Sequence, residues 1–378
     1  MLIALQNVLR NAPSLKNDND NDEELIKTSL TIVIPTYNEE SNIKFCLSSL
    51  LESINPCQNW NILVVDDCST DKTIEVVEGI RRKNQVSRNL INIFNAGPRP
   101  EDVRWVGKNW PCYQAINQIE SSWVLFLDAD VEIANKTLRS SLRQAINEGI
   151  DLLSLAPRIK CNCLAEWMVQ PIIATLLTIG FPIKDSNDPK NPTAFAAGPF
   201  MLFRMKSYKD IGGHKDLSGE VVEDLALARR IKKSGYKLKF LLGLDALKIS
   251  MYDDIKDLWE GWSKNWFIGL DRNIGKSMLA SLVVFCTFSV PWLIFFISMM
   301  QLVNSISEPI KVYICLFLSI VSIILQFVLR KWCEAKFKFP TKYWYLMGVG
   351  GLIITAIGPS SILKTITGIG WTWKGRQL

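Results

Sequence analysis

Short apolar runs alternate with amphipathic stretches through the first part of the chain. The runs are continuously apolar and rich in β-branched residues, which predicts buried strands, and the stretches between them place apolar residues at helical spacing. This alternation predicts βαβ units with right-handed crossovers, and hence a mostly parallel sheet with helices on both faces. The predicted strands are 30–35, 60–66, 90–96 and 123–128, and the predicted helices are 39–54, 71–83, 107–120 and 135–149.

The second part of the chain changes character after Lys276. Residues 277–307 carry no formal charge, and neither do 312–329 and 343–363. Each segment is close to the ~20 residues that cross the hydrocarbon core of a bilayer. We predict spans at about 278–303 and 311–329. Residues 344–363 form either a third span or, given their glycines and Pro359, a kinked or re-entrant segment.

These patterns divide the chain into four parts. Residues 1–10 are either a short amphipathic anchor or a frayed terminus, and they lack the basic residues that open a signal peptide. The loop 330–342 is basic, which predicts that it faces the cytoplasm and that the sheet domain, two spans away, does so too. The predicted parts are an N-terminal segment with a polar linker (1–29), a sheet domain (30–270), a membrane domain (277–370) and a tail (371–378).

Composition and charge exclude several classes of protein. The net charge of +6 comes from scattered Lys and Arg, so no nucleic-acid footprint is indicated. The nine cysteines are dispersed without a CxxC pair, which predicts reduced thiols in a cytosolic compartment. His214 is the only histidine, which excludes imidazole-rich metal sites and Ser-His-Asp catalysis.

Acidic and polar clusters follow three of the predicted strands. The clusters are "PTYNEE" after the first strand, "DDCSTD" after the second and "DAD" after the fourth. Ligands of open α/β sheets bind beyond the carboxyl ends of the strands, so we expect one common site there. Asp128 and Asp130 can hold Mg²⁺ or Mn²⁺, or they can simply form a turn. Helix capping explains Asp71, but it does not explain the adjacent charges of Asp66 and Asp67 beside a buried strand.

In order and spacing, these motifs resemble those of family 2 glycosyltransferases. The shared blocks are "VIPTYNEE", "VVDDCSTDKT", "LFLDAD" and, downstream, "EVVEDLALARRIKKSGYKL", and together they cover about residues 30–245. The resemblance implies a GT-A-like, Rossmann-type nucleotide-sugar fold in the domain 30–270. It further implies that Asp128 and Asp130 bind a metal ion and the donor diphosphate, and that the nucleotide pocket is lined by Pro35, Tyr37, Glu39, Asp66 and Asp67.

The chemistry of sugar transfer assigns further roles. The leaving nucleoside diphosphate gains negative charge that Mg²⁺ or Mn²⁺ would neutralise, and the acceptor must lose a proton to a general base. We predict that Asp224 is this base, with its neighbour Glu223 as the alternative; both residues also suit a helix N-terminus. A single base without a partner acid favours direct displacement with inversion. Lys108 is either a diphosphate-binding cation or a solvated lysine, and Gly198 lets the backbone approach the donor sugar.

Two further stretches narrow the subgroup. "VRWVGKNWPCYQA" and "AAGPFMLFRMKSYKDIGGH" resemble membrane-bound members that glycosylate isoprenoid lipids such as carotenoids and hopanoids. Many relatives carry a Gln-x-x-Arg-Trp motif where this chain has "LWEGWSKNWFIGL", and the departure favours transfer of a single sugar over polymer synthesis. The stretch 164–183 lies in the membrane interface, faces the acceptor or forms a buried core helix.

The resulting prediction is an inverting, metal-dependent, multi-pass membrane glycosyltransferase. It would move one sugar from a nucleotide-sugar, UDP-hexose in the first instance, to a lipid hydroxyl on a carotenoid or hopanoid. A hydroxyl is favoured because a carboxylate is already ionised and needs no base. The alternatives are a polyprenyl-phosphate, glycolipid or polysaccharide glycosyltransferase and, from another class, a non-catalytic membrane protein that binds nucleotide-sugars. An oxidoreductase is excluded because no GxGxxG follows the first strand.

Overall fold

The computed structural model describes residues 5, 12–16, 23–83, 85–304 and 309–377. The anchor or frayed end predicted for residues 1–10 lies, apart from Leu5, outside the described residues. The chain divides into two compact units. The sheet unit comprises residues 3–160 and 180–250, and the helical unit comprises 1–2, 161–179 and 251–378.

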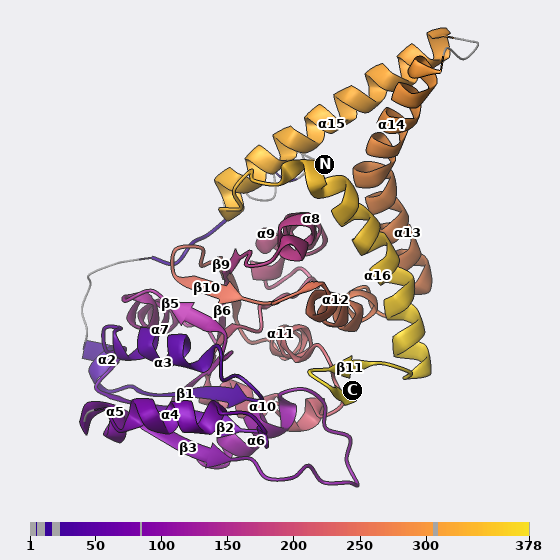
Figure 1. Cartoon of the computed structure of the whole chain (residues 1–378). Coiled ribbons are helices and arrows are strands. Elements are labelled where there is room, and N and C mark those ends of the chain that lie inside the picture. Colours follow the sequence, from indigo (N-terminus) through magenta and orange to yellow (C-terminus); the bar gives the residue numbers. More distant parts are fainter. Residues whose placement is uncertain (1–4, 6–11, 17–22, 84, 305–308, 378) are drawn as a thin grey trace. The chain divides into compact units, whose positions relative to one another are not determined.

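A seven-stranded sheet forms the centre of the sheet unit (Figure 1). All neighbouring strands in it run parallel except at β8, which is antiparallel to both of its neighbours. Its strand order is β3-β2-β1-β4-β8-β6-β9. The bounds are β1 Ser29–Thr36, β2 Asn59–Asp66, β3 Ile91–Asn95, β4 Trp123–Leu127, β6 Leu152–Ala156, β8 Phe200–Arg204 and β9 Leu238–Leu242.

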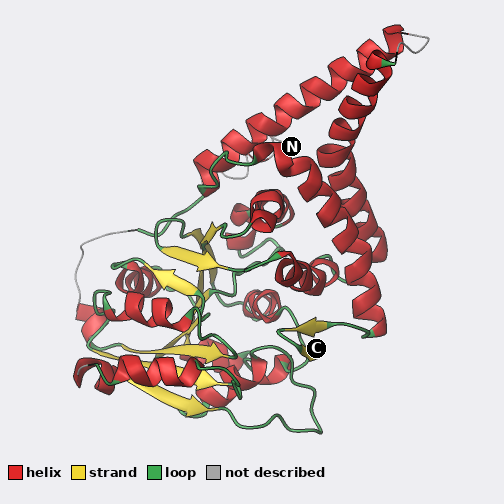
Figure 2. Ribbon diagram, viewed as in Figure 1, coloured by secondary structure: helices red, strands yellow, loops and turns green. Residues whose placement is uncertain are grey.

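Helices of the sheet unit connect these strands (Figure 2). The chain moves outward from β1 to β3 and then returns to β4 on the other side of β1, so right-handed crossovers place α3 and α4 on one face and α6 on the other. The helices are α2 Glu23–Ile26, α3 Ile43–Leu51, α4 Thr73–Arg81, α5 Gln85–Leu90, α6 Asn109–Ile116, α7 Thr137–Asn147, α9 Ile183–Asn187, α10 Met205–Asp210 and α11 Glu223–Lys233.

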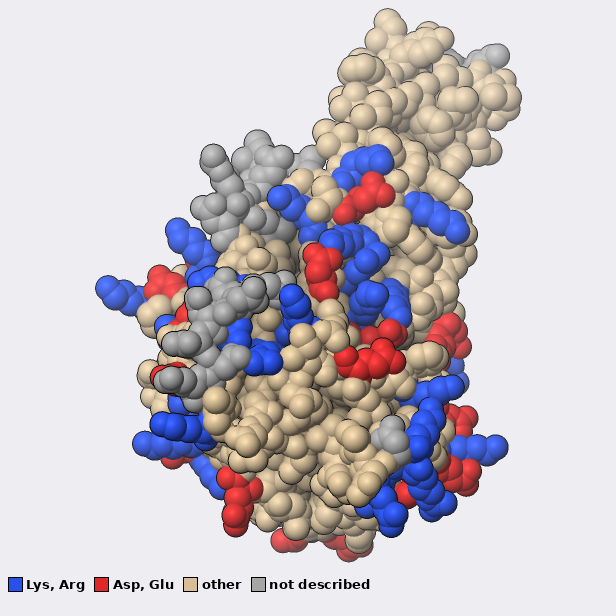
Figure 3. Space-filling view, turned by 90° about the vertical axis from the view of Figure 1, so that its left-hand side faces the viewer, with Lys and Arg blue, Asp and Glu red and all other residues tan. Residues whose placement is uncertain are grey.

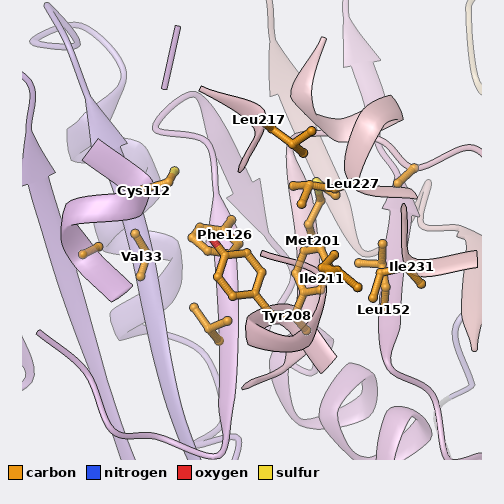
Figure 4. Close-up of a cluster of buried hydrophobic side chains, with 14 of the residues drawn as sticks. Val33, Cys112, Phe126, Leu152, Met201, Tyr208, Ile211, Leu217, Leu227 and Ile231 are labelled. Atoms are coloured by element: carbon orange, nitrogen blue, oxygen red, sulfur yellow. The ribbon is translucent and has the colours of Figure 1, made fainter. Parts of the chain in front are cut away.

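A buried hydrophobic cluster lies on the α6 face of the sheet (Figure 4). Val33 and Phe126 contribute from β1 and β4, Cys112 from α6 and Leu227 from α11, and none of these four is more than 2% exposed. Strand residues alternate between the two faces, so the cluster takes Val33 from β1, the alternate residues Leu63 and Val65 from β2, and Val124 and Phe126 from β4. The cluster therefore packs α6 and α11 against the strands whose ends carry the acidic loops.

A smaller sheet adjoins the turn that contains Asp128 and Asp130. Its order is β5-β10-β7, with bounds β5 Val131–Ile133, β7 Arg158–Lys160 and β10 Leu247–Ser250. β5 begins directly after Asp130, and the backbone N–H of Ser250 donates to the carbonyl of Asp130 at 3.5 Å. The turn is thus held between a strand of the main sheet and a strand of the smaller one.

The fold class predicted from the sequence is confirmed. All four predicted strands and all four predicted helices occur, and each helix is shorter at both ends than its apolar pattern extends. The third helix, for example, is Asn109–Ile116 rather than 107–120. The pattern did not predict α5 or the antiparallel β8, whose direction is set by pairing with β4 and β6.

The helical unit contains three long apolar helices among the described residues, each long enough to cross a membrane: Ile274–Val303, Pro309–Phe337 and Trp344–Thr367. On the face shown in Figure 3, the upper part of the helical unit shows no Lys, Arg, Asp or Glu side chain. The elements of the unit are α8 Leu164–Gly180, α12 Ile255–Gly269, α13 Ile274–Val284, a π-helical turn Phe285–Ser289, α14 Val290–Val303, α15 Pro309–Phe337, η3 Trp344–Leu346, α16 Met347–Thr367, β11 Thr372–Trp373 and β12 Arg376–Gln377.

The first of the three apolar helices contains a backbone carbonyl without its usual helical hydrogen bond, and a side chain of the second helix donates to it. Pro291 has no N–H, so the carbonyl of Thr287 cannot receive its usual helical hydrogen bond. The Gln326 side chain of α15 donates to the carbonyls of Thr287 and Phe288 at 2.9 and 3.2 Å and accepts from Trp292 Nε1 at 2.8 Å. This polar side chain inside an apolar helix is therefore explained by the backbone groups that it satisfies.

The third apolar segment runs as one helix, α16, with Pro359 inside it. Its glycines mark places where neighbouring helices come very close. A Cβ on Gly350 would lie 2.2 Å from the carbonyl oxygen of Met168 in α8, and one on Gly358 would lie 1.9 Å from Ser281 Oγ in α13. Small residues of this kind let membrane helices pack backbone to backbone. The glycines thus serve packing between helices.

The tail folds back onto α12 as a short hairpin. Strands β11 and β12 pair in antiparallel fashion across Lys374 and Gly375, both of which have positive φ. Thr372 hydrogen-bonds to Glu260 of α12, and the ammonium of Lys264, one turn further on, lies 4.4 Å from the centre of the Trp373 ring. These contacts fix the tail within the helical unit.

Candidate functional site

The three acidic loops lie at one edge of the main sheet. They follow β2, β1 and β4, which are neighbours in that order and run parallel. β8 runs the other way, so the residues before it, Gly198 and Pro199, reach the same edge. The backbone N–H of Asp128 donates to the carbonyl of Pro199 at 3.2 Å. The expected meeting of these loops at the carboxyl edge is therefore present in the structure.

The loops after β1 and β2 are fastened to each other by side-chain hydrogen bonds. The N–H of Asn38 donates to Ser69 Oγ at 3.1 Å, and the N–H of Thr70 donates to Asn38 Oδ1 at 2.8 Å. Glu39 N donates to Thr73 Oγ1 at 2.7 Å. Asp71, one residue before the N-cap of α4, accepts from the backbone N–H of Thr73 through its Oδ1 at 2.9 Å. The two loops thus behave as one rigid rim.

Asp66 and Asp67 are both buried, at 6% and 4% exposure, but they have different partners. The Asp66 carboxylate accepts from the N–H of Ser69 at 3.2 Å and shapes its own loop. Asp67 accepts from Arg99 at 2.6 Å. Arg99 also donates to the carbonyls of Trp105 and Gly107 at 2.9 and 2.8 Å. A buried carboxylate held by one charge-assisted hydrogen bond from an arginine that is itself fixed by two carbonyls is preorganised to receive a polar ligand edge.

Asp128 and Asp130 lie, half-buried, near the buried thiol of Cys46 in α3. Cys46 Sγ lies 3.8 Å from the carbonyl oxygen of Asp128. Burial raises the pKa of this thiol, and the carboxylates of Asp130, Asp128, Glu39 and Glu132 raise it further. Four carboxylates thus lie within electrostatic reach of one buried atom. Such a concentration of negative charge favours a cation at this end of the sheet.

Lys108 bridges the two halves of the candidate site. Its Nζ lies 2.5 Å from Asp128 Oδ1, 3.2 Å from Glu223 Oε1 and 3.4 Å from the carbonyl oxygen of Gly198. Burial lowers the pKa of Lys108, but Asp128 and Glu223 outweigh it and hold the pKa well above the ordinary value. Lys108 is therefore a charged, paired residue, and the alternative of a solvated lysine is wrong.

Asp224 occupies the first turn of α11 and is oriented by two backbone donors. Its Oδ2 accepts from the N–H of Gly198 at 2.9 Å, and its Oδ1 accepts from the N–H of Leu225 at 2.7 Å. Burial raises the pKa of Asp224 to about 6, with Glu223 adding to the shift and Lys108 opposing it. A carboxylate poised near neutral pH suits a general base.

The neighbours of Gly198, which lies two residues before β8, explain why this position is a glycine. A Cβ at this position would lie 3.0 Å from Asp224 Oδ2 and 3.4 Å from Lys108 Nζ. The contact with Asp224 is tighter than ordinary packing, so a larger residue would push this carboxylate aside. The position is thus restricted by its neighbours in the protein, and the close approach of this backbone to a donor sugar stays a prediction.

His214 has a structural role in this unit. It is 1% exposed, and its Nδ1 lies 2.6 Å from the hydroxyl of Tyr208, which also accepts from the His214 backbone N–H at 2.9 Å. Burial lowers the pKa of His214 to about 3, so the ring is neutral at physiological pH. It therefore supports the cluster behind the site without carrying charge.

Most of the predicted site residues lie at the carboxyl edge of the main sheet, but at different places along it. Pro35 lies within β1 opposite Val65, and Tyr37 is half-buried just beyond the strand. Sequence reasoning missed Arg99 and Cys46. Arg99 could have been found because it follows the third strand at the same edge, whereas nothing in the apolar helix of Cys46 indicates its place beneath the carboxylates.

The carboxylate oxygens at this edge suit a metal ion whose coordination is completed by a substrate. Among the residues that the structure describes, no three His, Cys, Asp or Glu side chains form a ready metal cluster. Mg²⁺ is commonly held by one or two carboxylates together with substrate phosphates, without an all-protein cage. Asp128 and Asp130, two oxygen donors on one turn, fit that pattern. They would hold Mg²⁺ or Mn²⁺ jointly with a diphosphate.

The fold and the acidic edge together define a class. A mannosyltransferase from Pyrobaculum calidifontis, solved with GDP-Man and Mn²⁺, has the same fold with a TM-score of 0.53. The superposition covers 97% of this chain and 94% of that one, at 14% sequence identity. The sheet unit therefore has a fold of the GT-A type.

A sequence match assigns one domain of the chain to a family. Residues 31–212 match the model described as Glycosyl transferase family 2, so the chain carries a glycosyltransferase domain of that family, an enzyme domain. The chain is also 26% identical over 255 residues to 4,4'-diaponeurosporenoate glycosyltransferases of Staphylococcus aureus, including those of strains bovine RF122 / ET3-1 and USA300. The match covers 67% of this chain and spans 64% of the length of those relatives.

Proposed function

We propose that this protein transfers one sugar from a nucleotide-sugar to the hydroxyl of a membrane lipid, with inversion at the anomeric carbon. The observation that carries the proposal is the bridge made by Lys108. Its ammonium pairs with Asp128 on the donor side and with Glu223, next to Asp224, on the acceptor side. The carboxylates that the reaction needs are therefore connected through one side chain at one edge of the sheet.

The donor would lie along the rim formed by the loops after β1, β2 and β4. Asp67, held by Arg99, would accept a hydrogen bond from the nucleobase or ribose. Pro35, Tyr37, Glu39 and Asp66 would complete the wall of the pocket. Asp128 and Asp130 would hold Mg²⁺ or Mn²⁺, whose Lewis acidity neutralises charge on the leaving diphosphate. The fold neighbour solved with GDP-Man and Mn²⁺ supports this ligand class.

Asp224 would take the proton from the acceptor hydroxyl. Two backbone N–H groups fix its carboxylate, and its pKa of about 6 leaves it mostly ionised at neutral pH yet basic enough to accept a proton. Oxygen attack at the anomeric carbon then breaks the bond to the diphosphate in a single displacement, which inverts that centre. Lys108 adds positive charge beside the departing phosphate.

The acceptor is proposed to be an isoprenoid lipid such as a carotenoid or hopanoid. The three long apolar helices would hold it in the bilayer, with the sheet unit on the cytoplasmic side because loop 330–342 is basic. The Staphylococcus aureus relatives are named for diaponeurosporenoate, a carotenoid carboxylate. A carboxylate acceptor is therefore the second candidate, and it would need no general base.

One experiment tests the reaction and separates these acceptors. Membranes containing the full-length chain are incubated with labelled UDP-sugars, and GDP-mannose in parallel, and extracted lipids are analysed by mass spectrometry. We expect a lipid glycoside whose stability to alkali identifies an acetal (O-glycosidic) linkage to a hydroxyl. An alkali-labile glycosyl ester would identify a carboxylate acceptor, and donor binding without any product would favour a non-catalytic binding protein.

A further inference from the structure

The pairing of Lys108 with Asp128 suggests an order of ligand binding. This inference rests on the proposed function, in which Asp128 and Asp130 bind a divalent ion. The Lys108 ammonium lies 2.5 Å from Asp128 Oδ1, on the carboxylate that the metal would use. Asp128 and Lys108 are 29% and 20% exposed, so water screens the charges only partly.

We propose that Lys108 acts as a resident cation that keeps a divalent ion off Asp128 until the donor diphosphate arrives. A divalent ion and an ammonium on one carboxylate are like charges only a few ångströms apart, and they repel each other. The diphosphate removes the conflict because it brings enough negative charge to pair with both cations. The metal ion and the nucleotide-sugar therefore bind together, and the metal ion does not occupy the site before the nucleotide-sugar arrives.

The surroundings of Lys108 let its head group move while its backbone stays fixed. The next residue, Asn109, is 1% exposed, and its side chain donates to the carbonyls of Leu217 and Glu220, each at 2.8 Å. The ammonium has a second carboxylate, Glu223, at 3.2 Å. When the Lys108 ammonium leaves Asp128 and turns toward the phosphate, it keeps Glu223 as a partner. Its buried charge is therefore never unpaired.

Glu223 positions the Lys108 ammonium in this arrangement. It is 13% exposed on its side chain and holds the ammonium between the donor carboxylate and the base. Lys108 also lowers the pKa of Asp224, while burial and Glu223 raise it. The lysine is accordingly a positioning residue that connects donor arrival to the acceptor side.

Mn²⁺ binding to the full-length protein in non-ionic detergent tests the proposal. Free Mn²⁺ is measured by electron paramagnetic resonance, first without nucleotide and then with saturating UDP, with GDP in parallel. For the wild type we expect weak binding of Mn²⁺ alone and binding at least about tenfold tighter with nucleotide. For Lys108→Met we expect Mn²⁺ alone to bind at least about tenfold tighter than it does to the wild type, with a smaller gain on adding nucleotide.

Controls separate this effect from misfolding. Lys239→Met removes a lysine from an ion pair with Glu148 in the same unit and should leave Mn²⁺ binding unchanged. Lys108→Arg keeps the charge and should resemble the wild type. Lys108→Gln is the second neutral variant if Lys108→Met does not fold, since its amide can still donate to Asp128.

The outcomes distinguish this inference from the proposed function. If Mn²⁺ binds with UDP but no more tightly to the folded neutral variants alone than to the wild type, the resident-cation role is wrong and metal-dependent transfer stands. If Mn²⁺ binds to neither protein even with UDP or GDP, the metal site itself is wrong, and the inference falls with it.

Discussion

Acidification from pH 7 to pH 5 should reduce sugar transfer about tenfold through protonation of Asp224. Only the ionised carboxylate can accept the proton of the acceptor hydroxyl, so activity is present above the pKa and lost below it. With a pKa of about 6, roughly nine-tenths of Asp224 is ionised at pH 7 and roughly one-tenth at pH 5. A carboxyl with the ordinary value of 3.8 would remain almost fully ionised across that range.

The assay is the initial rate of lipid glycosylation at subsaturating donor from pH 4.5 to 8.5. Asp224→Asn removes the base and should lower the rate by about 10²–10⁴-fold while retaining nucleotide binding. Asp216→Asn serves as the matched control, because that carboxylate is exposed and pairs with Arg230 away from the site. A rate that stays level between pH 7 and pH 5 in folded protein, or an Asp224→Asn variant close to wild-type activity, would refute the assignment of the base.

Three further predictions follow from the geometry. Chelation by EDTA should abolish transfer, with recovery on adding Mg²⁺ or Mn²⁺; full activity in EDTA would contradict the metal proposal. Gly198→Ala should lower kcat about tenfold with the melting temperature nearly unchanged, because its Cβ would lie 3.0 Å from Asp224 Oδ2. Gln326→Leu should destabilise the protein in detergent by about 1–3 kcal/mol, because the carbonyls of Thr287 and Phe288 lose the amide of Gln326 as a donor; an unchanged thermal unfolding curve would argue against this role.

The acidic edge could be predicted from the sequence because two simple regularities combine there. Buried parallel strands are visible as apolar runs, and their carboxyl ends must meet at one edge. "DDCSTD" and "DAD" were therefore expected to lie together, and the order β2-β1-β4 brings them there. The shortened helices have a related cause, since the side chains of Asn38 and Asp71 form hydrogen bonds that join the two loops.

The partners of the acidic residues could not be predicted in the same way. Arg99 meets Asp67, and Lys108 meets both Asp128 and Glu223, across separations of 20 to more than 100 residues that only the packed sheet unit specifies. The antiparallel direction of β8 is a further example, because an isolated apolar strand carries no sign of its orientation. Local pattern thus specifies the elements, whereas long-range packing decides which charges neutralise each other.

The hydrogen bonds of Gln326 bear on how the protein enters a membrane. The helix Ile274–Val303 contains Pro291 and therefore carries a backbone carbonyl, that of Thr287, without its usual helical donor. In hydrocarbon such a group is costly, and its donor belongs to the following helix, Pro309–Phe337. The two helices consequently depend on each other from the moment of insertion. They should enter the bilayer as a pair, a helical hairpin whose second arm completes the backbone of the first.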